Sequence, residues 1–133
     1  MSQPTPPLTA SRREPLKVLL LENIHPTARD MFSAEGFVVE ALTGALKEEE
    51  LKQKVRDVHV LGIRSKSRIT PAVLAEAKQL LSLGCFCIGT NQVALKDANK
   101  RGIPVFNAPF SNTRSVAELI LSEVIALARQ LGD

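Results

Sequence analysis

Short apolar segments alternate with more polar ones along most of this chain. Five apolar segments have the length of β-strands and lie at residues 16–21, 37–39, 58–63, 81–88 and 103–106. Helices are expected between them at residues 26–35, 46–56, 71–80 and 93–101. Apolar strands that alternate with helices are typical of a parallel sheet covered on both faces. The pattern therefore predicts an α/β fold, a flavodoxin-like parallel sheet of about five strands with helices on both faces and strand one central.

Proline and glycine mark several of these boundaries. Pro26 opens the first helix, and Gly36 follows its last residue. Thr70 offers an N-cap side chain, and Pro71 suits the first turn of the third helix. Gly102 ends the fourth helix.

Residues 113–133 are predicted to form a long C-terminal helix. Ser115 and Glu118 have the spacing of a capping box, which places the helix start at Ser115. At about 100° per residue, apolar side chains cover roughly half of the circumference, more than one sheet normally buries. These side chains are Val116, Ala117, Ile120, Leu121, Val124, Ile125, Leu127, Ala128 and Leu131. The helix is either a buried final helix or, as we favour, one that contacts two surfaces, such as its own sheet and a second domain or subunit.

Composition narrows the class of protein. The 133 residues are 44% hydrophobic and 23% charged, which is typical of one globular domain. The formal net charge of +3 comes from basic residues scattered among acidic ones, and the chain has no Tyr or Trp on which bases could stack. Nucleic acid is therefore not an expected partner.

The ends and the cysteines bear on location. Residues 1–15 are rich in proline and lack the apolar core of a signal peptide, so a disordered tail is predicted there. No apolar segment is long enough to span a bilayer, and two cysteines make no disulfide framework. These observations predict a cytoplasmic protein without a membrane partner.

Polar residues follow several predicted strands, at the sheet edge where open α/β folds bind ligands. Arg64 and Ser65 follow strand three, Gly89 follows strand four, and Asn107 follows strand five. A guanidinium, a hydroxyl, an amide and accessible backbone N–H groups suit a small polar anion. Each residue also has a purely structural explanation, because surface arginines pair with carboxylates and Gly and Asn form turns.

Other reactive residues are weaker candidates. Cys85 and Cys87 share one face of an apolar strand and lack further ligands, so we interpret them as core residues and expect no metal. His25 precedes Pro26 and is expected to serve the helix start, and His59 has no visible catalytic partner. The chain contains no G-x-G-x-x-G, P-loop or G-x-S-x-G motif.

Three segments resemble a known family. They are residues 61–65 (Leu-Gly-Ile-Arg-Ser), 88–93 (Ile-Gly-Thr-Asn-Gln-Val) and 101–118 (Arg-Gly-Ile-Pro-Val-Phe-Asn-Ala-Pro-Phe-Ser-Asn-Thr-Arg-Ser-Val-Ala-Glu). They are similar to the amino-terminal part of the D-3-phosphoglycerate dehydrogenases, within the D-isomer-specific 2-hydroxyacid dehydrogenase family. The resemblance implies an NAD-dependent oxidation of 3-phospho-D-glycerate to 3-phosphohydroxypyruvate, the first step of L-serine biosynthesis.

The resemblance also implies roles for individual residues. The implied substrate-binding residues are Arg64, Ser65, Gly89, Thr90 and Asn107. The loop that contains Ile88 would also face the nicotinamide, so Ile88 is the one implied cofactor contact. Residues 16–112 would form an incomplete substrate-binding domain. Residues 113–133 would cross to a nucleotide-binding domain and contribute to a homo-oligomer.

In this family the glycine-rich NAD loop and the catalytic arginine, glutamate and histidine lie beyond the matched segment. The resemblance therefore implies a fragment that is inactive alone, with no catalytic residue of its own. A stand-alone module for anion binding or dimerisation is the alternative. A receiver-like signalling domain is rejected, because Arg64 and Asn107 stand where such a domain needs an acid and a lysine.

Overall fold

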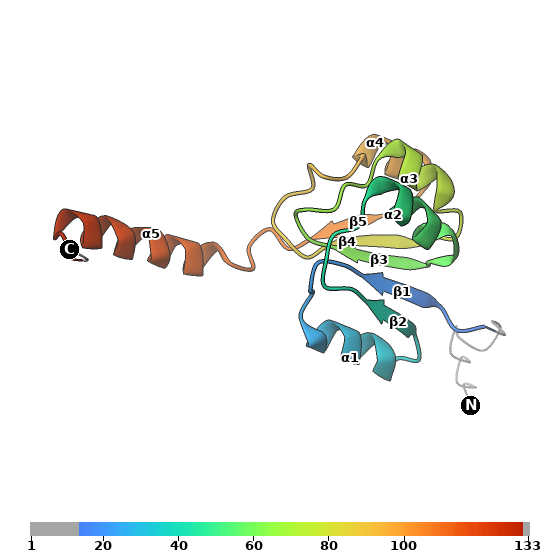
Figure 1. The fold of residues 1–133 in the computed structure, drawn as a ribbon, viewed down its shortest axis with the longest axis horizontal. Coiled ribbons are helices and arrows are strands. Elements are labelled where there is room, and N and C mark those ends of the chain that lie inside the picture. Colours follow the sequence, from blue (N-terminus) through green and yellow to red (C-terminus); the bar gives the residue numbers. More distant parts are fainter. Residues whose placement is uncertain (1–13, 132–133) are drawn as a thin grey trace, which may run out of the picture.

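The computed structural model describes residues 14–131, so the predicted tail lies outside the described residues except for Glu14 and Pro15. Figure 1 shows one parallel sheet with helices on both of its faces. The strands are β1 (Lys17–Leu20), β2 (Val38–Ala41), β3 (Val60–Ile63), β4 (Ser82–Cys85) and β5 (Val105–Asn107). The helices are α1 (Pro26–Ala34), α2 (Glu48–Lys54) with a 3-10 turn η2 (Val55–Asp57), α3 (Pro71–Glu76), α4 (Leu95–Lys100) and α5 (Thr113–Ala128).

The strand order is β2-β1-β3-β4-β5, and every pair is parallel. This is the flavodoxin-like order, which confirms the predicted fold. One detail of the prediction is wrong: β1 is an interior strand, but β3 occupies the middle of the sheet. The loops after β1 and β3 consequently lie side by side at the carboxyl edge.

Two apolar clusters hold the helices against the sheet. Leu19, Leu61 and Leu83 are register neighbours on β1, β3 and β4, and they are fully buried beneath α2, α3 and α4. Val18 and Leu20 face the opposite side of the sheet, where α1 packs. Each buried leucine stabilises the fold by about 2 kcal/mol. β1 and β3 are almost entirely buried because both faces of the sheet are covered there, whereas the edge strands β2 and β5 are mostly exposed.

Several elements are shorter than predicted. α3 stops at Glu76 instead of residue 80, because Ala77 leaves helical geometry with a ψ of 62°. α4 starts at Leu95 instead of residue 93. Its expected first residue, Val93, instead forms a parallel bridge with Ile69. β4 likewise ends before its predicted end at residue 88. At the start of α4, tertiary pairing therefore overrides local propensity.

The sheet face opposite α2, α3 and α4 contains a glycine pair where a larger residue would clash. Gly62 and Gly84 are register neighbours on β3 and β4. A Cβ atom on Gly62 would lie 2.6 Å from Cδ2 of Leu20 and 3.1 Å from Cε2 of Phe86. The space above Gly62 is therefore already filled.

Gly62→Ala is expected to lower the free energy of unfolding by about 2 kcal/mol, because the added methyl displaces the buried Leu20 side chain. Urea unfolding followed by circular dichroism measures this. Gly44→Ala is the matched control, because nothing lies within 4 Å of its Cβ position. Equal stability of the two variants would contradict the packing argument.

The last helix differs from its predicted start and lies apart from the sheet. α5 begins at Thr113 after Asn112, so the start predicted at Ser115 is wrong. Glu118 accepts a hydrogen bond from Nε of Arg114 at 2.7 Å and caps nothing. The helix extends away from the sheet (Figure 1), and none of its residues is buried. The interpretation of a helix buried on its own sheet is therefore wrong.

Candidate functional site

The turn after β1 reverses the chain beside the loop after β3. Glu22 and Asn23 both adopt left-handed backbone conformations, with φ of 63° and 53°. Such conformations are uncommon for residues other than glycine, and Asn tolerates them better than Glu. Their N–H groups donate to the carbonyls of Gly44 and Leu42 at 3.2 and 3.1 Å. The turn thereby joins the loop after β2 to the end of β1.

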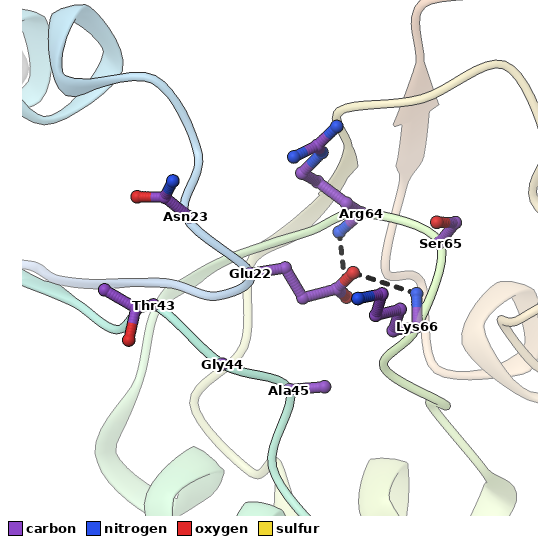
Figure 2. A pocket seen from close by; sticks show the side chains of 8 residues that line it. All are labelled: Glu22, Asn23, Thr43, Gly44, Ala45, Arg64, Ser65 and Lys66. Atoms are coloured by element: carbon purple, nitrogen blue, oxygen red, sulfur yellow. Dashed lines mark hydrogen bonds between the residues drawn. The ribbon is translucent and has the colours of Figure 1, made fainter.

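The carboxylate of Glu22 organises the loop after β3. It accepts hydrogen bonds from the backbone N–H groups of Arg64, Lys66 and Ser67 at 3.1, 2.9 and 2.8 Å. Figure 2 shows the first two of these bonds reaching the same carboxylate. Glu22 is only 7% exposed, so its charge is held by these donors rather than by water. Successive N–H groups that converge on one carboxylate fix the shape of this loop.

The ionised form of Glu22 is favoured in the folded protein. Burial alone would raise the pKa of this carboxyl, but the hydrogen bonds from Lys66, Ser67 and Arg64 outweigh burial and hold the pKa below its ordinary value. The side chain of Ser67 also lowers the pKa of Glu22. The hydroxyl oxygen of Ser67 is buried and has no well-aligned hydrogen-bond partner.

A pocket of about 330 Å³ opens beside this loop. Its walls come from the turns after β1, β2 and β3 (Figure 2), and its lining residues are Glu22, Asn23, Thr43, Gly44, Ala45, Arg64, Ser65 and Lys66. The Arg64 side chain is exposed and projects away from the Glu22 carboxylate. Arg64 also lines a second hollow, of about 380 Å³, on the side of Phe86. A guanidinium between two hollows can bind an anion from either one.

The remaining predicted residues lie after β4 and at the end of β5. Gly89 and Thr90 follow β4, and neither lines the two hollows around Arg64. The side chain of Asn107, at the end of β5, donates from Nδ2 to the carbonyl of Ile88 at 2.9 Å. Ile88 itself is exposed. The structure thus places Arg64 with Ser65 in one pocket, Ile88, Gly89 and Thr90 in the adjacent loop, and Asn107 at the end of β5.

Six of the eight residues that line the pocket were not predicted as site residues, namely Glu22, Asn23, Thr43, Gly44, Ala45 and Lys66. An acidic residue directly after a buried strand is a usable signal, because such a carboxylate needs hydrogen-bond donors. Nothing in the sequence places Thr43 opposite Arg64.

Cys85 and the two histidines have structural roles. Burial, followed by the nearby Cys87, raises the pKa of the Cys85 thiol to about 11, so Cys85 is an unreactive core residue. His25 caps α1 by accepting the N–H of Thr27 at Nδ1, 3.3 Å away, as predicted. Nδ1 of His59 accepts the N–H of Lys17 at 3.1 Å.

Two kinds of feature are absent from residues 14–131. No group of three or more His, Cys, Asp or Glu side chains lies close enough together to hold a metal ion. No helix in this part of the chain has the length and apolar character needed to cross a membrane.

A parallel sheet of order 2-1-3-4-5 with a pocket at the carboxyl ends of its strands is the arrangement of α/β domains that bind small ligands at this edge. Residues 18–129 match the family described as D-isomer specific 2-hydroxyacid dehydrogenase, catalytic domain. The chain belongs to this family.

Similar relatives within the family share one enzyme name. The chain is 55% identical over 127 residues to D-3-phosphoglycerate dehydrogenase of Dictyostelium discoideum, a match that covers 96% of this chain and 31% of the relative. It is 59% identical over 118 residues to D-3-phosphoglycerate dehydrogenase 1 of Saccharomyces cerevisiae, covering 89% and 25%. The Escherichia coli D-3-phosphoglycerate dehydrogenase is 51% identical over 122 residues, covering 91% and 30%. The chain thus spans between a quarter and a third of these relatives' length.

Solved structures agree on the fold. The TT0316 protein of Thermus thermophilus superposes with a TM-score of 0.82 at 30% identity, over 87% of this chain and 38% of that one. The NAD+-bound 3-phosphoglycerate dehydrogenase of Entamoeba histolytica superposes with a TM-score of 0.74 at 18% identity, over 85% and 39%. The second likeness supports the fold alone.

Proposed function

We propose that this chain is the substrate-binding part of an NAD-dependent oxidoreductase that oxidises 3-phospho-D-glycerate to 3-phosphohydroxypyruvate. The observation that carries the proposal is the pocket of Arg64, Ser65 and Lys66 at the carboxyl edge of the sheet. Relatives that are 51–59% identical over this segment are named D-3-phosphoglycerate dehydrogenase. The reaction would be the first step of L-serine biosynthesis.

The pocket residues suit a substrate with two anionic ends. The guanidinium of Arg64 offers a planar fork to a phosphate or carboxylate, and Lys66 adds a second cation. The hydroxyls of Ser65 and Thr43 can donate to the remaining oxygens. The Glu22 carboxylate also lines the pocket, but its charge is stabilised by three backbone N–H groups. The cations therefore dominate the surface that a ligand meets.

The loop after β4 would contact the rest of the substrate. Gly89 and Thr90 offer backbone and hydroxyl donors, and Asn107 holds this loop through the Ile88 carbonyl. We propose Gly89, Thr90 and Asn107 as substrate-binding residues together with Arg64. These residues bind and orient the substrate.

This chain has few residues that could hold NAD, which would accept the hydride. The 133 residues contain no G-x-G-x-x-G loop to hold a pyrophosphate. Ile88 offers an exposed apolar contact for the nicotinamide. We propose that NAD is held mainly by residues outside this chain and that the chain alone is inactive.

The exposed apolar surface of α5 supports a role in assembly. Leu119, Ile120, Leu121, Val124 and Ile125 are each more than half exposed. A patch of this kind is typical of a domain or subunit interface. We propose that residues 16–112 form the substrate-binding domain. Residues 113–133 would cross to a nucleotide-binding domain and contribute to a homo-oligomer.

The proposal is tested by grafting this chain in place of the matching segment of the Escherichia coli relative and measuring NAD reduction. The graft is expected to oxidise 3-phospho-D-glycerate in preference to D-glycerate and D-lactate, while the isolated chain oxidises none of them. A graft that prefers an unphosphorylated 2-hydroxy acid would contradict the substrate. A graft that is folded but inactive, with an isolated chain that binds 3-phospho-D-glycerate, would favour a stand-alone anion-binding module.

A further inference from the structure

Gln92 is a buried polar residue between the two loops of the proposed site. It is 8% exposed. Its Nε2 donates to the carbonyl of Arg64 at 2.8 Å and lies 3.3 Å from the carbonyl of Gly89. The same nitrogen lies 3.2 Å from Sγ of Cys87. One side-chain amide thus connects the loop after β3 with the loop after β4.

The backbone of Gln92 is anchored to the core. Its carbonyl accepts the N–H of Ile69 at 2.9 Å, and Val93 forms the parallel bridge with Ile69. Ile69 and Val93 are both buried. The backbone that carries the side-chain amide is therefore held in a fixed position.

The same contacts hold Arg64 from two sides. Its N–H donates to Glu22, and its carbonyl accepts from Gln92. The exposed guanidinium therefore extends from a backbone held at both of its polar groups. Gly89 is held through its carbonyl by Gln92, and Sγ of Cys87 donates to the same carbonyl at 3.2 Å.

We propose that Gln92 is a positioning residue that sets the separation between the Arg64 loop and the Gly89 loop, so that one anionic substrate contacts both. This inference rests on the proposed function of the site. Removing the donor leaves two loop carbonyls without their shared partner, and the loops then move independently. Binding groups that are no longer held in position bind substrate more weakly, because they must be ordered when the substrate binds.

The test uses NMR titration of the unaltered chain with 3-phospho-D-glycerate. The side-chain amide signals of Gln92 and the backbone amides of both loops are expected to shift together with one Kd. Shifts confined to the Arg64 loop would overturn the inference. No shift anywhere would instead overturn the proposed binding function, and the positioning role would fall with it.

Gln92→Met keeps the length of the side chain and removes the donor. In the grafted enzyme we expect a KM about tenfold higher with a kcat changed less than KM. Gln53→Met, on the exposed surface of α2, is the matched control and is expected to keep both constants. An unchanged KM in folded Gln92→Met would overturn the inference. If this variant does not fold, the NMR titration of the unaltered chain tests the inference by itself.

Discussion

Glu22→Gln is expected to lower the free energy of unfolding at pH 7 by about 2–3 kcal/mol, since hydrogen bonds to a buried charge are strong. A glutamine oxygen can accept some of the three N–H groups, but its NH2 group would face donors from the same loop. Buried donors would then lose their acceptor. The loop that carries Arg64 is expected to lose its order first.

The effect of Glu22 is expected to depend on pH. Because the folded protein holds the pKa of Glu22 below its ordinary value, ionised Glu22 stabilises the fold above the unfolded pKa, near 4.3. That stabilisation is lost as the pH falls through the folded pKa. The difference in stability between the unaltered chain and Glu22→Gln should therefore shrink between about pH 5 and pH 3.

Urea unfolding of both chains at pH 7, 5 and 3 measures this dependence. Glu35→Gln is the control, because Glu35 is exposed at the end of α1. Its stability is expected to stay within about 0.5 kcal/mol of the unaltered chain. A constant difference between the unaltered chain and Glu22→Gln at all three pH values would rule out the ionised carboxylate as the cause.

Arg64→Ala is expected to weaken the binding of 3-phospho-D-glycerate by roughly 100-fold, because truncating one partner of a charge-assisted pair commonly costs this much or more. Folding should be nearly unaffected, because the guanidinium is exposed and the alanine backbone keeps the hydrogen bonds to Glu22 and Gln92. Arg64→Lys keeps the charge but loses the planar fork, so an intermediate loss of about tenfold is expected.

Calorimetric titration of the isolated chain and kinetics of the grafted enzyme measure the loss. Arg101→Ala removes an exposed arginine after α4, outside both hollows, and is expected to leave Kd and KM unchanged. Equal losses in the two variants would show that general positive charge, rather than the Arg64 fork, attracts the substrate. No loss in Arg64→Ala would remove Arg64 from the site.

Much of the site could be predicted from the sequence because parallel strands all point the same way. Once the strands were assigned, Arg64, Ser65, Gly89 and Asn107 had to lie at one edge of the sheet. The sequence could not predict which of these residues share a pocket, since that depends on which loops contact each other. The structure puts Arg64 and Ser65 in one pocket and Gly89 in the adjacent loop.

The α/β class, the order of the elements and the apolar strands could be read from the sequence, because they follow from local periodicity and from short connections between neighbours. Only the folded chain sets the early end of α3, the late start of α4, the exposed course of α5 and the roles of Glu22 and Gln92. Glu22 bonds residues more than 40 positions away in the chain, and Gln92 bonds Arg64 at a separation of 28. Such contacts exist only after the sheet has brought the strand ends together, so no local pattern specifies them.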